Sequence, residues 1–217
     1  MNAGTARSEV TVVVPATPYE WPFHGALTPA RTALVACCDS SWRPAGAGAA
    51  DAVLISLAEA VVALGGLVVA VVATPARQAR LTGLTEATVL GAGPGGPAPT
   101  PAPLFSAAGI PTLTVSATGV SAFHASPLDD LLRMHGRTDL LLAGWGLEGP
   151  VHSTLRAAND RGYECLLVGD ASIAHDPTLT FAALDMVRHS GGIFGAYANA
   201  QEVLEALSQI PTPVEAS

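Results

Sequence analysis

Short runs of apolar residues alternate with amphipathic segments along most of this chain. Six of the runs have the length and the apolar character of strands that are buried on both faces. They are Thr32–Cys38, Leu67–Ala73, Pro111–Ala117, Asp139–Gly144, Tyr163–Val168 and Ile193–Tyr197. Between these runs, apolar residues recur at helical spacing, which predicts helices. These helices cover Asp51–Leu64, Pro127–His135, Thr178–His189 and Ala200–Leu207.

The stretch Asp139–Ala171 has the pattern of one complete strand–helix–strand unit. Pro150 suits the first turn of its helix, where a missing N–H costs nothing, and Gly162 suits the end of that helix. Crossovers of this kind are right-handed and join parallel strands. The alternation therefore predicts an α/β fold of three layers, a doubly wound parallel six-stranded sheet with helices on both faces. Ligands of such sheets bind beyond the carboxyl ends of the strands, here around Gly144–Pro150 and Cys37–Trp42.

The predicted domain covers residues 31–210, with an N-terminal arm at 1–30 and a tail at 211–217. Pro18–Leu27 concentrates Tyr19, Trp21 and Phe23 in a chain that is only 5% aromatic. An aromatic arm packs on a surface, and the sequence leaves open whether that surface is its own domain or a neighbouring subunit.

Two segments between the second and third predicted strands are less regular. Leu81–Leu90 is compatible with a short helix or strand. Gly91–Pro103 is rich in glycine and proline, which predicts a surface loop. This loop is no phosphate-binding loop, because prolines replace the N–H groups that would be needed and no Lys-Ser/Thr pair follows. We therefore expect no nucleotide cofactor, and no cofactor of another kind is indicated.

Composition narrows the function classes. A chain of 217 residues with 49% hydrophobic and 13% charged residues fits one domain with a large core. A net charge of -8 with ten Lys plus Arg argues against a nucleic-acid surface. Three cysteines without a secretory signal favour the cytoplasm. The apolar run Ala52–Ala73 is divided by Ser56, Glu59 and Gly65–Gly66, so we expect no membrane span. Spacings typical of metal ligands are absent from the sequence, so no metal site is expected.

Three segments carry a resemblance to known proteins. They are PYEWPFHGAL (Pro18–Leu27) with Thr32–Leu34, RAANDRGYECLL (Arg156–Leu167), and GGIFG (Gly191–Gly195) with Val203–Leu207. Together they resemble the isochorismatase-like cysteine hydrolases, and among them most closely the biuret amidohydrolases. The resemblance implies a homo-oligomer, either a dimer or a tetramer. It also implies amide hydrolysis by an Asp, a Lys and a nucleophilic Cys, with backbone N–H groups that stabilise the oxyanion.

The sequence departs from the family at each of these three residues. The strand that ends in the family's Asp ends here in Cys38, with Asp39 one residue later and so on the other face of a regular strand. With Phe123 as the anchor of the alignment, Ala117 stands at the Lys position and Pro150 at the nucleophile. Family hydrolysis is therefore not expected. Proline also removes one oxyanion donor, a loss that costs roughly 10²–10³ in rate in a hydrolase where it was tested.

Candidate residues for other chemistry are polar groups near the predicted strand ends, each with a structural alternative. The candidate acid–base residues are Asp39, His124, Glu148 and His152. The candidate substrate-binding residues are Cys38, Trp42, Ala117, Phe123, Trp145 and Pro150. The two tryptophans would supply apolar walls for a flat ligand, although tryptophan is as readily part of a core. Adjacent cysteines in an apolar strand are typical of inert buried thiols.

Three functions are compatible with this sequence. The first is an enzyme that binds a hydrophobic small molecule in a biosynthetic pathway and catalyses proton transfer, dehydration or cyclisation without a covalent intermediate. The second is a pseudoenzyme that serves as a partner subunit or a ligand-binding module. The third is an amidohydrolase that uses residues other than the family's. Polar groups kept at the strand ends favour the first, whereas alanine and proline at the family positions fit the first two equally.

Overall fold

The structure is a computed structural model that describes residues 11–39, 44, 48–73 and 101–211. The strands are β1 (Thr32–Asp39), β2 (Leu67–Ala73), β3 (Leu113–Ala117), β4 (Asp139–Trp145), β5 (Glu164–Ile173) and β6 (Ala196–Ala198). The α-helices are α1 (Gly48–Ala63), α2 (Pro101–Ala107), α3 (Leu128–Met134), α4 (His152–Asn159), α5 (Thr180–Arg188) and α6 (Ala200–Ser208).

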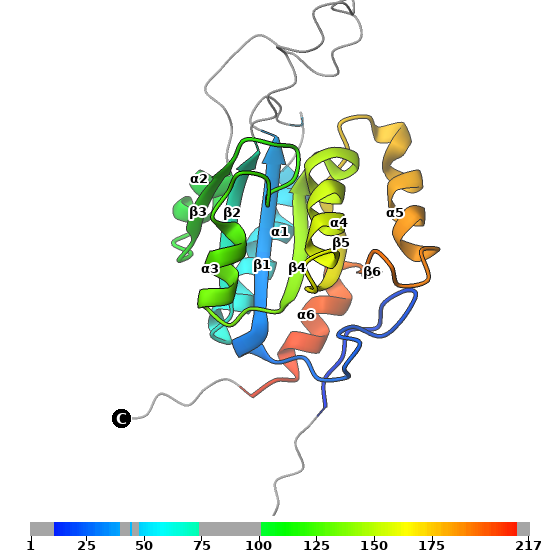
Figure 1. Ribbon diagram of the computed structural model, residues 1–217. Helices are drawn as coiled ribbons and strands as arrows, with labels where there is room; N and C mark the ends of the chain where they lie inside the picture. Colours follow the sequence, from blue (N-terminus) through cyan, green and yellow to red (C-terminus); the bar gives the residue numbers. More distant parts are fainter. Residues whose placement is uncertain (1–10, 40–43, 45–47, 74–100, 212–217) are drawn as a thin grey trace, which may run out of the picture.

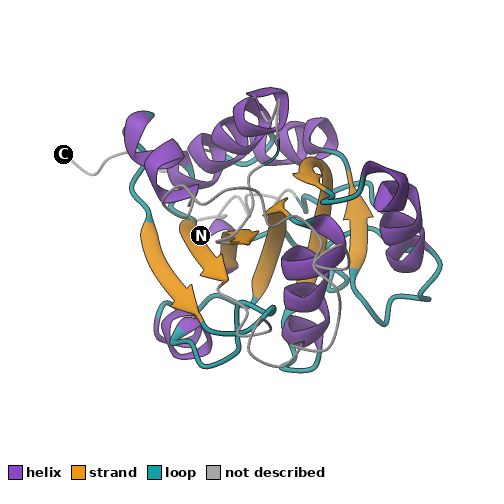
Figure 2. Ribbon diagram, turned by 90° about the horizontal axis from the view of Figure 1, so that it is seen from above, coloured by secondary structure: helices purple, strands orange, loops and turns teal. Residues whose placement is uncertain are grey.

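The strands form one six-stranded sheet in the order β3-β2-β1-β4-β5-β6, and every neighbouring pair is parallel. Helices cover both faces of this sheet (Figures 1 and 2). Helices α1, α2 and α6 pack on one face, and α3, α4 and α5 pack on the other. The predicted three-layer doubly wound α/β fold is confirmed.

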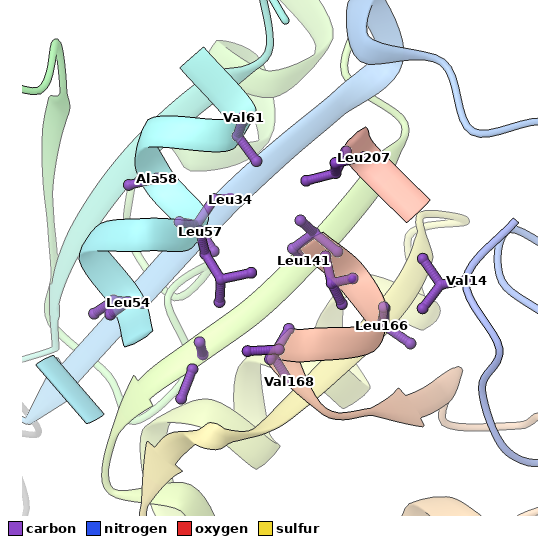
Figure 3. Packing of buried hydrophobic residues seen from close by; sticks show 14 of the residues in the cluster. Val14, Leu34, Leu54, Leu57, Ala58, Val61, Leu141, Leu166, Val168 and Leu207 are labelled. Carbon is purple, nitrogen blue, oxygen red and sulfur yellow. The ribbon is translucent and has the colours of Figure 1, made fainter. Parts of the chain in front are cut away.

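Alternation along β1 separates two hydrophobic cores. Leu34 and Ala36 pack with α1 and α6, whereas Val35 and Cys37 pack with α3, α4 and α5. Figure 3 shows the first core, where Leu57 of α1 and Leu207 of α6 point toward the sheet. All seven residues of β4 are buried. Burial on both faces explains why the central strands are continuous apolar runs instead of alternating ones.

The last strand begins later than predicted. The sequence predicted Ile193–Tyr197, but β6 begins at Ala196, because Gly191, Gly192 and Gly195 all have positive φ angles and form turns. A β-carbon on Gly195 would lie 2.3 Å from the Cys165 carbonyl oxygen, so this turn also requires glycine for close packing. Ile193, predicted as a strand residue, is 71% exposed.

Two further element boundaries differ from the prediction. Helix α2 begins at Pro101, inside the predicted loop, and its buried Phe105 contributes to the core beside α1. Proline is compatible with a first helical turn, and burial of the phenylalanine outweighs the weak local pattern. Strand β5 continues to Ile173, five residues past the predicted end at Val168. Leu81–Leu90 lies outside the described residues.

The N-terminal arm packs on its own domain. Val12, Val14 and Trp21 are buried in the core beside α1 and α6. Thr17 and Tyr197 exchange backbone hydrogen bonds of 2.9 and 2.8 Å, which extends the sheet beyond β6 by one antiparallel bridge. Of the two alternatives for the arm, this arrangement matches packing on its own domain.

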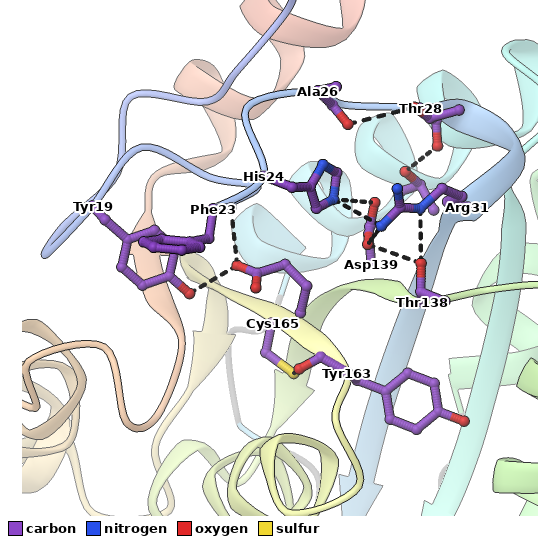
Figure 4. Close-up of polar contacts among 12 residues, drawn as sticks. Tyr19, Phe23, His24, Ala26, Thr28, Arg31, Thr138, Asp139, Tyr163 and Cys165 are labelled. Carbon is purple, nitrogen blue, oxygen red and sulfur yellow. Dashed lines mark hydrogen bonds and ion pairs between the residues drawn. The ribbon is translucent and has the colours of Figure 1, made fainter.

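Two carboxylates at the starts of β4 and β5 hold the arm (Figure 4). The Asp139 carboxylate is fully buried and lies 3.1 Å from the Arg31 guanidinium and 3.3 Å from the His24 imidazole. The Tyr19 hydroxyl donates a 2.8 Å hydrogen bond to Glu164. These contacts place the arm along the amino edge of the sheet, opposite the edge where ligands of such folds bind.

The apolar run Ala52–Ala73 is divided between α1 and β2, as predicted. Within the described part of the chain, no helix has both the length and the apolar character that crossing a bilayer requires.

Candidate functional site

The described side chains nearest the carboxyl ends of β1 and β3 are those of Cys38 and Ala117. Cys38 is fully buried near the end of β1, and Ala117 is buried at the end of β3. The backbone of Asp39 continues β1 in register with Ala73, but its side chain lies outside the described residues, as does all of Trp42. Cys38 and Ala117 therefore supply neither a carboxylate nor a cation to this edge of the sheet.

The neighbouring thiol of Cys37 is deeply buried beneath α4. Its Sγ lies 3.6 Å from the Thr154 hydroxyl, which also accepts a 2.8 Å hydrogen bond from the Ala122 backbone N–H. Burial raises the pKa of the Cys37 thiol to about 12, and this effect outweighs the hydrogen bond to Thr154, which lowers that pKa. The thiol is therefore protonated at neutral pH and unsuited to nucleophilic attack.

A tight loop joins β4 to α4. Gly146 has φ of 90°, and residues Leu147–Val151 form one turn of π-helix that contains Pro150. The helix predicted to begin at Pro150 is thus preceded by a π turn. The backbone N–H groups of Gly149 and Val151 both donate to the Gly146 carbonyl, at 3.0 and 3.2 Å. Pro150 has no N–H, so none of the three positions 149–151 in this described loop offers an unused donor to an oxyanion.

Glu148, a predicted acid–base residue, connects this loop to the segment after β5. Its Oε1 accepts a 2.8 Å hydrogen bond from the Asp176 N–H, and its Oε2 accepts a 3.0 Å bond from the His175 N–H. The same Oε2 lies 3.6 Å from Nδ1 of the His175 ring. Glu148 thus positions the loop and also places a negative charge beside an imidazole.

His175 lies directly against the β4–α4 loop. A β-carbon on Gly146 would lie 2.4 Å from Cε1 of the His175 ring and 2.8 Å from Cδ of Pro150, and one on Gly149 would lie 3.4 Å from the same Cε1. The ring therefore occupies the space above these two glycines, beside Pro150. Its side chain is 14% exposed. Sequence reasoning missed His175, because the predicted end of β5 at Val168 placed this histidine too far from the edge of the sheet.

His152, another predicted acid–base residue, lies between α4 and α5. Its Nδ1 accepts a 3.2 Å hydrogen bond from the Arg156 side chain, and its ring packs edge-on against Phe194 at 6.1 Å. Burial lowers the pKa of His152, and the nearby Arg156 charge lowers it further. The ring is thus held within α4 by Arg156 and packed against Phe194, and the backbone of Ala183 on α5 also lies beside it.

Phe123 and His124 lie on the segment between β3 and α3. The Phe123 ring stacks on Tyr163 at 5.7 Å, and the Arg161 guanidinium lies 4.8 Å from its centre. Tyr163 immediately precedes β5, so these contacts place Phe123 away from the carboxyl edge of the sheet. His124 is exposed, and its side chain lies close to Gly119, where a β-carbon would lie 2.5 Å from Cβ and 2.6 Å from ring Cγ of His124.

Trp145 ends β4 on the side of α1. Its indole N–H donates a 3.1 Å hydrogen bond to the Asp51 carboxylate, and both side chains are buried. Trp145 therefore connects the sheet to the first turn of α1. The sequence predicted Asp51 only as the first residue of a helix, and its hydrogen bond with the indole emerges from the structure.

The structure thus brings together Glu148, Pro150 and the unpredicted His175, while His152, Phe123 and Trp145 face other elements. This group can position a proton donor or acceptor, but it lacks a described thiol nucleophile. Within the described residues, His, Cys, Asp and Glu side chains form no cluster of three that could hold a metal ion.

Comparison with known proteins identifies relatives of this fold. Residues 35–198 match the isochorismatase domain. The structure of an isochorismatase family protein from Burkholderia thailandensis is 26% identical, with a TM-score of 0.61 and a match that covers 84% of this chain and 97% of the other. A cysteine hydrolase from Pseudomonas syringae pv. phaseolicola is 18% identical with a TM-score of 0.65, covering 90% and 98% of the two chains. A nicotinamidase from Bacillus subtilis is 22% identical with a TM-score of 0.58, covering 75% and 97%. Because the domain match spans well over half of the chain, this protein belongs to the isochorismatase family.

Proposed function

We propose that this protein is a divergent isochorismatase family member that has lost the Asp-Lys-Cys triad, with a sequence most similar to the biuret amidohydrolases. We propose that it acts on a hydrophobic small molecule in a biosynthetic pathway by acid–base chemistry without a covalent intermediate. Proton transfer, dehydration and cyclisation are the reaction classes that such a site supports.

The chemistry at the three family positions supports the loss of hydrolysis. Pro150 provides neither a thiol nor an N–H, Ala117 provides no cation, and Cys38 provides no carboxylate. The N–H groups on either side of Pro150 are already bonded to the Gly146 carbonyl. A tetrahedral intermediate at this loop would therefore lack both a nucleophile and the donors that stabilise its oxyanion.

The observation that carries the acid–base proposal is the position of His175 over the β4–α4 loop, beside the Glu148 carboxylate. At 3.6 Å the Glu148 oxygen is beyond hydrogen-bond distance from Nδ1, but it places a carboxylate directly beside the ring. In this proposal His175 transfers the proton. Glu148 is a positioning residue, because its carboxylate holds the backbone N–H groups of His175 and Asp176 and lies beside the His175 ring. Imidazole is the side chain best suited to proton transfer near neutral pH.

Exchange of carbon-bound protons tests this proposal without knowledge of the natural substrate. A panel of aryl ketones and cyclic 1,3-diones is incubated with the protein in D₂O, and loss of C–H signals is followed by NMR. We expect catalysed exchange on at least one compound and a loss of about 10²–10⁴-fold in rate for His175→Gln. His189→Gln is the matched control, because His189 is largely exposed and follows directly on the last residue of α5. Exchange that is unchanged in His175→Gln would contradict the role of His175.

A ligand-binding module or partner subunit without catalysis is the second candidate function. It is favoured by the two backbone N–H groups that occupy the Glu148 carboxylate and by the burial of His152 between helices. Binding of panel compounds without any exchange would support it. The third candidate, an amidohydrolase with other residues, is disfavoured by the high pKa and complete burial of Cys37.

We also propose that the protein is a cytoplasmic homo-oligomer, a dimer or a tetramer. None of the described Cys37, Cys38 and Cys165 forms a disulfide, which supports a reducing compartment. Phe23 on the arm is 76% exposed and packs edge-on against Tyr19, whose ring lies beside Gly192. Ile193 follows directly and is also exposed, so apolar side chains gather at this site, as they do at subunit contacts.

A further inference from the structure

Helices α1 and α6 form an apolar groove on the surface of the protein. The inner sides of both helices pack on the sheet (Figure 3), and their outer sides border two cavities of about 220 and 370 Å³ that share Leu204. We call this feature the α1–α6 groove. Its apolar lining consists of Ala52, Val53, Ala60, Ala63 and Leu64 from α1 and the residue that follows it, and of Ala200, Leu204, Leu207 and Ile210 from α6 and its end.

Helix α1 is unusual for a surface helix. Of its 16 residues only Asp51, Ser56 and Glu59 are polar, and apolar residues lie on its outer side as well as on its buried side. A helix that is apolar all round is normally covered on all sides. The outer side of α1 is therefore typical of a surface that binds another protein segment.

Among the described residues, the ionisable side chains on α1 and α6 and in the lining of the two cavities are all acidic. Helices α1 and α6 carry no cation in their sequences, and their four ionisable groups are Asp51, Glu59, Glu202 and Glu205. Asp170 adds a fifth carboxylate at the end of the groove near Ala200. Among the described residues, no ion pair involves Glu59, Glu202 or Glu205.

The opposite face of the sheet has a different charge pattern. Helices α3, α4 and α5 each carry an arginine in the last turn. Two of these arginines are close to acidic partners on their own helix, with Arg133 3.2 Å from Asp129 and Arg188 3.7 Å from Asp185. The excess of negative charge is therefore specific to the groove side and does not simply follow from the net charge of the chain.

We propose that the α1–α6 groove binds a basic amphipathic helix of a different protein. Apolar side chains of such a helix would fill the two cavities, and its Lys or Arg side chains would lie beside Glu59 and Glu205, which are both exposed. Helix α1 is about 24 Å long at 1.5 Å per residue, which matches about four turns of a partner helix. This inference does not depend on the catalytic proposal.

A second copy of this chain fits the groove less well. In a two-fold symmetric contact the same surface meets itself, so Glu59 and Glu205 would face the same carboxylates of the other copy. Like charges at such a contact oppose association. The charge pattern therefore favours a partner with the opposite charge.

The probe is a fluorescein-labelled 14-residue helical peptide of leucine and lysine, with the leucines on one face. Its binding is followed by fluorescence anisotropy, and a peptide of the same composition with a scrambled order tests the need for an apolar face. We expect binding of the amphipathic peptide only, and weaker binding at higher salt. Glu59→Arg/Glu205→Arg should weaken it about tenfold or more, and Ser56→Trp, which places bulk in the groove, should also weaken it.

Asp160→Arg is the matched control for charge, because Asp160 is exposed at the end of α4 on the other face of the sheet. It should leave the affinity within about twofold of the original value. Equal weakening by Asp160→Arg, equal binding of the scrambled peptide, or no binding of the amphipathic peptide would overturn the proposal. A native oligomer that dissociates on Ser56→Trp, measured by light scattering, would also overturn it in favour of a second copy in the groove.

Discussion

The His175 ring lies so close to the Gly146 backbone that a β-carbon there would come within 2.4 Å of Cε1 of the ring. Gly146 also has φ of 90°, a conformation that residues with a β-carbon rarely adopt. The β4–α4 loop is therefore shaped around an imidazole. Both the conformation and the missing side chain of Gly146 are needed for this contact.

Substitution Gly146→Ala should consequently destabilise the protein more than the same substitution at a glycine that has a positive φ but open space around it. Gly162 is the matched control, because its φ is 81° and no atom lies within 4 Å of the place that its β-carbon would take. We expect Gly162→Ala to cost about 1 kcal/mol from backbone strain alone. Gly146→Ala should cost a further ~1–3 kcal/mol, because the His175 ring must move. Urea unfolding measures both, and equal costs would show that the contact is absent.

The arm should contribute stability mainly through Trp21. This side chain is completely buried in the core beside α1 and α6, whereas Phe23, two residues later, is mostly exposed. Trp21→Ala should lower the free energy of unfolding by about 3–5 kcal/mol, and Phe23→Ala by less than about 0.5 kcal/mol. If Phe23→Ala lowers the mass in solution, the arm contacts a second subunit. Deletion of residues 1–27 that changes neither the melting temperature nor the mass would contradict both roles.

Stability should fall at acidic pH partly because of His152. Its folded pKa is lowered by burial and by Arg156, so the unfolded chain, with a histidine pKa of about 6.5, takes up the proton more readily. The stability contribution is therefore complete above about pH 6.5 and is lost as the pH falls toward the folded pKa. His152→Gln should flatten this part of the stability–pH curve, and His189→Gln, at an exposed position, should leave it unchanged. A curve that stays equally steep in His152→Gln would contradict this assignment.

The thiols should be inert in the folded protein. Cys37, Cys38 and Cys165 are fully buried, and burial raises the pKa of both Cys37 and Cys165. Iodoacetamide should leave the native chain unmodified and leave any proton-exchange activity intact, whereas all three thiols should react in urea. An acyl adduct on any cysteine after incubation with an amide, seen by intact mass spectrometry, would show a covalent mechanism instead.

The sheet could be predicted because each strand is marked by local features of the sequence, and the same features recur from strand to strand. Strands buried on both faces are continuous apolar runs, and glycines or prolines mark their ends, as Gly65–Gly66 does before β2. The prediction was wrong where a tertiary contact decides the structure. Burial of Phe105 makes a helix of a proline-rich segment, and the packing of Gly195 on Cys165 delays β6.

The candidate site was predicted only in part, because a strand end is known from sequence to within a few residues and side-chain direction is not known at all. Glu148 and Pro150 were predicted at the correct loop. His175 was missed when β5 was ended at Val168, and the sequence did not indicate that the His152 side chain packs against Phe194. Position in the sequence thus located the loop but not the imidazole beside it.

The triple variant Cys38→Asp/Ala117→Lys/Pro150→Cys tests the proposed loss of the Asp-Lys-Cys triad. Residues of such a triad act as a unit, so Pro150→Cys alone should remain inactive on amides. The triple variant should give weak hydrolysis if the loop keeps its shape. The thiol introduced by Pro150→Cys should then become alkylated in the native protein, which provides a check that the new side chain is accessible.

Ammonia release from biuret and nicotinamide by the unmodified protein, compared with a heat-killed control, tests whether this chain hydrolyses amides. Pro150, Ala117 and Cys38 provide no nucleophile, cation or carboxylate, so we predict no release above that control, even at high protein concentration and long incubation. Release above the heat-killed control, abolished when the substrate is omitted, would contradict the account and show that this chain hydrolyses amides with other residues.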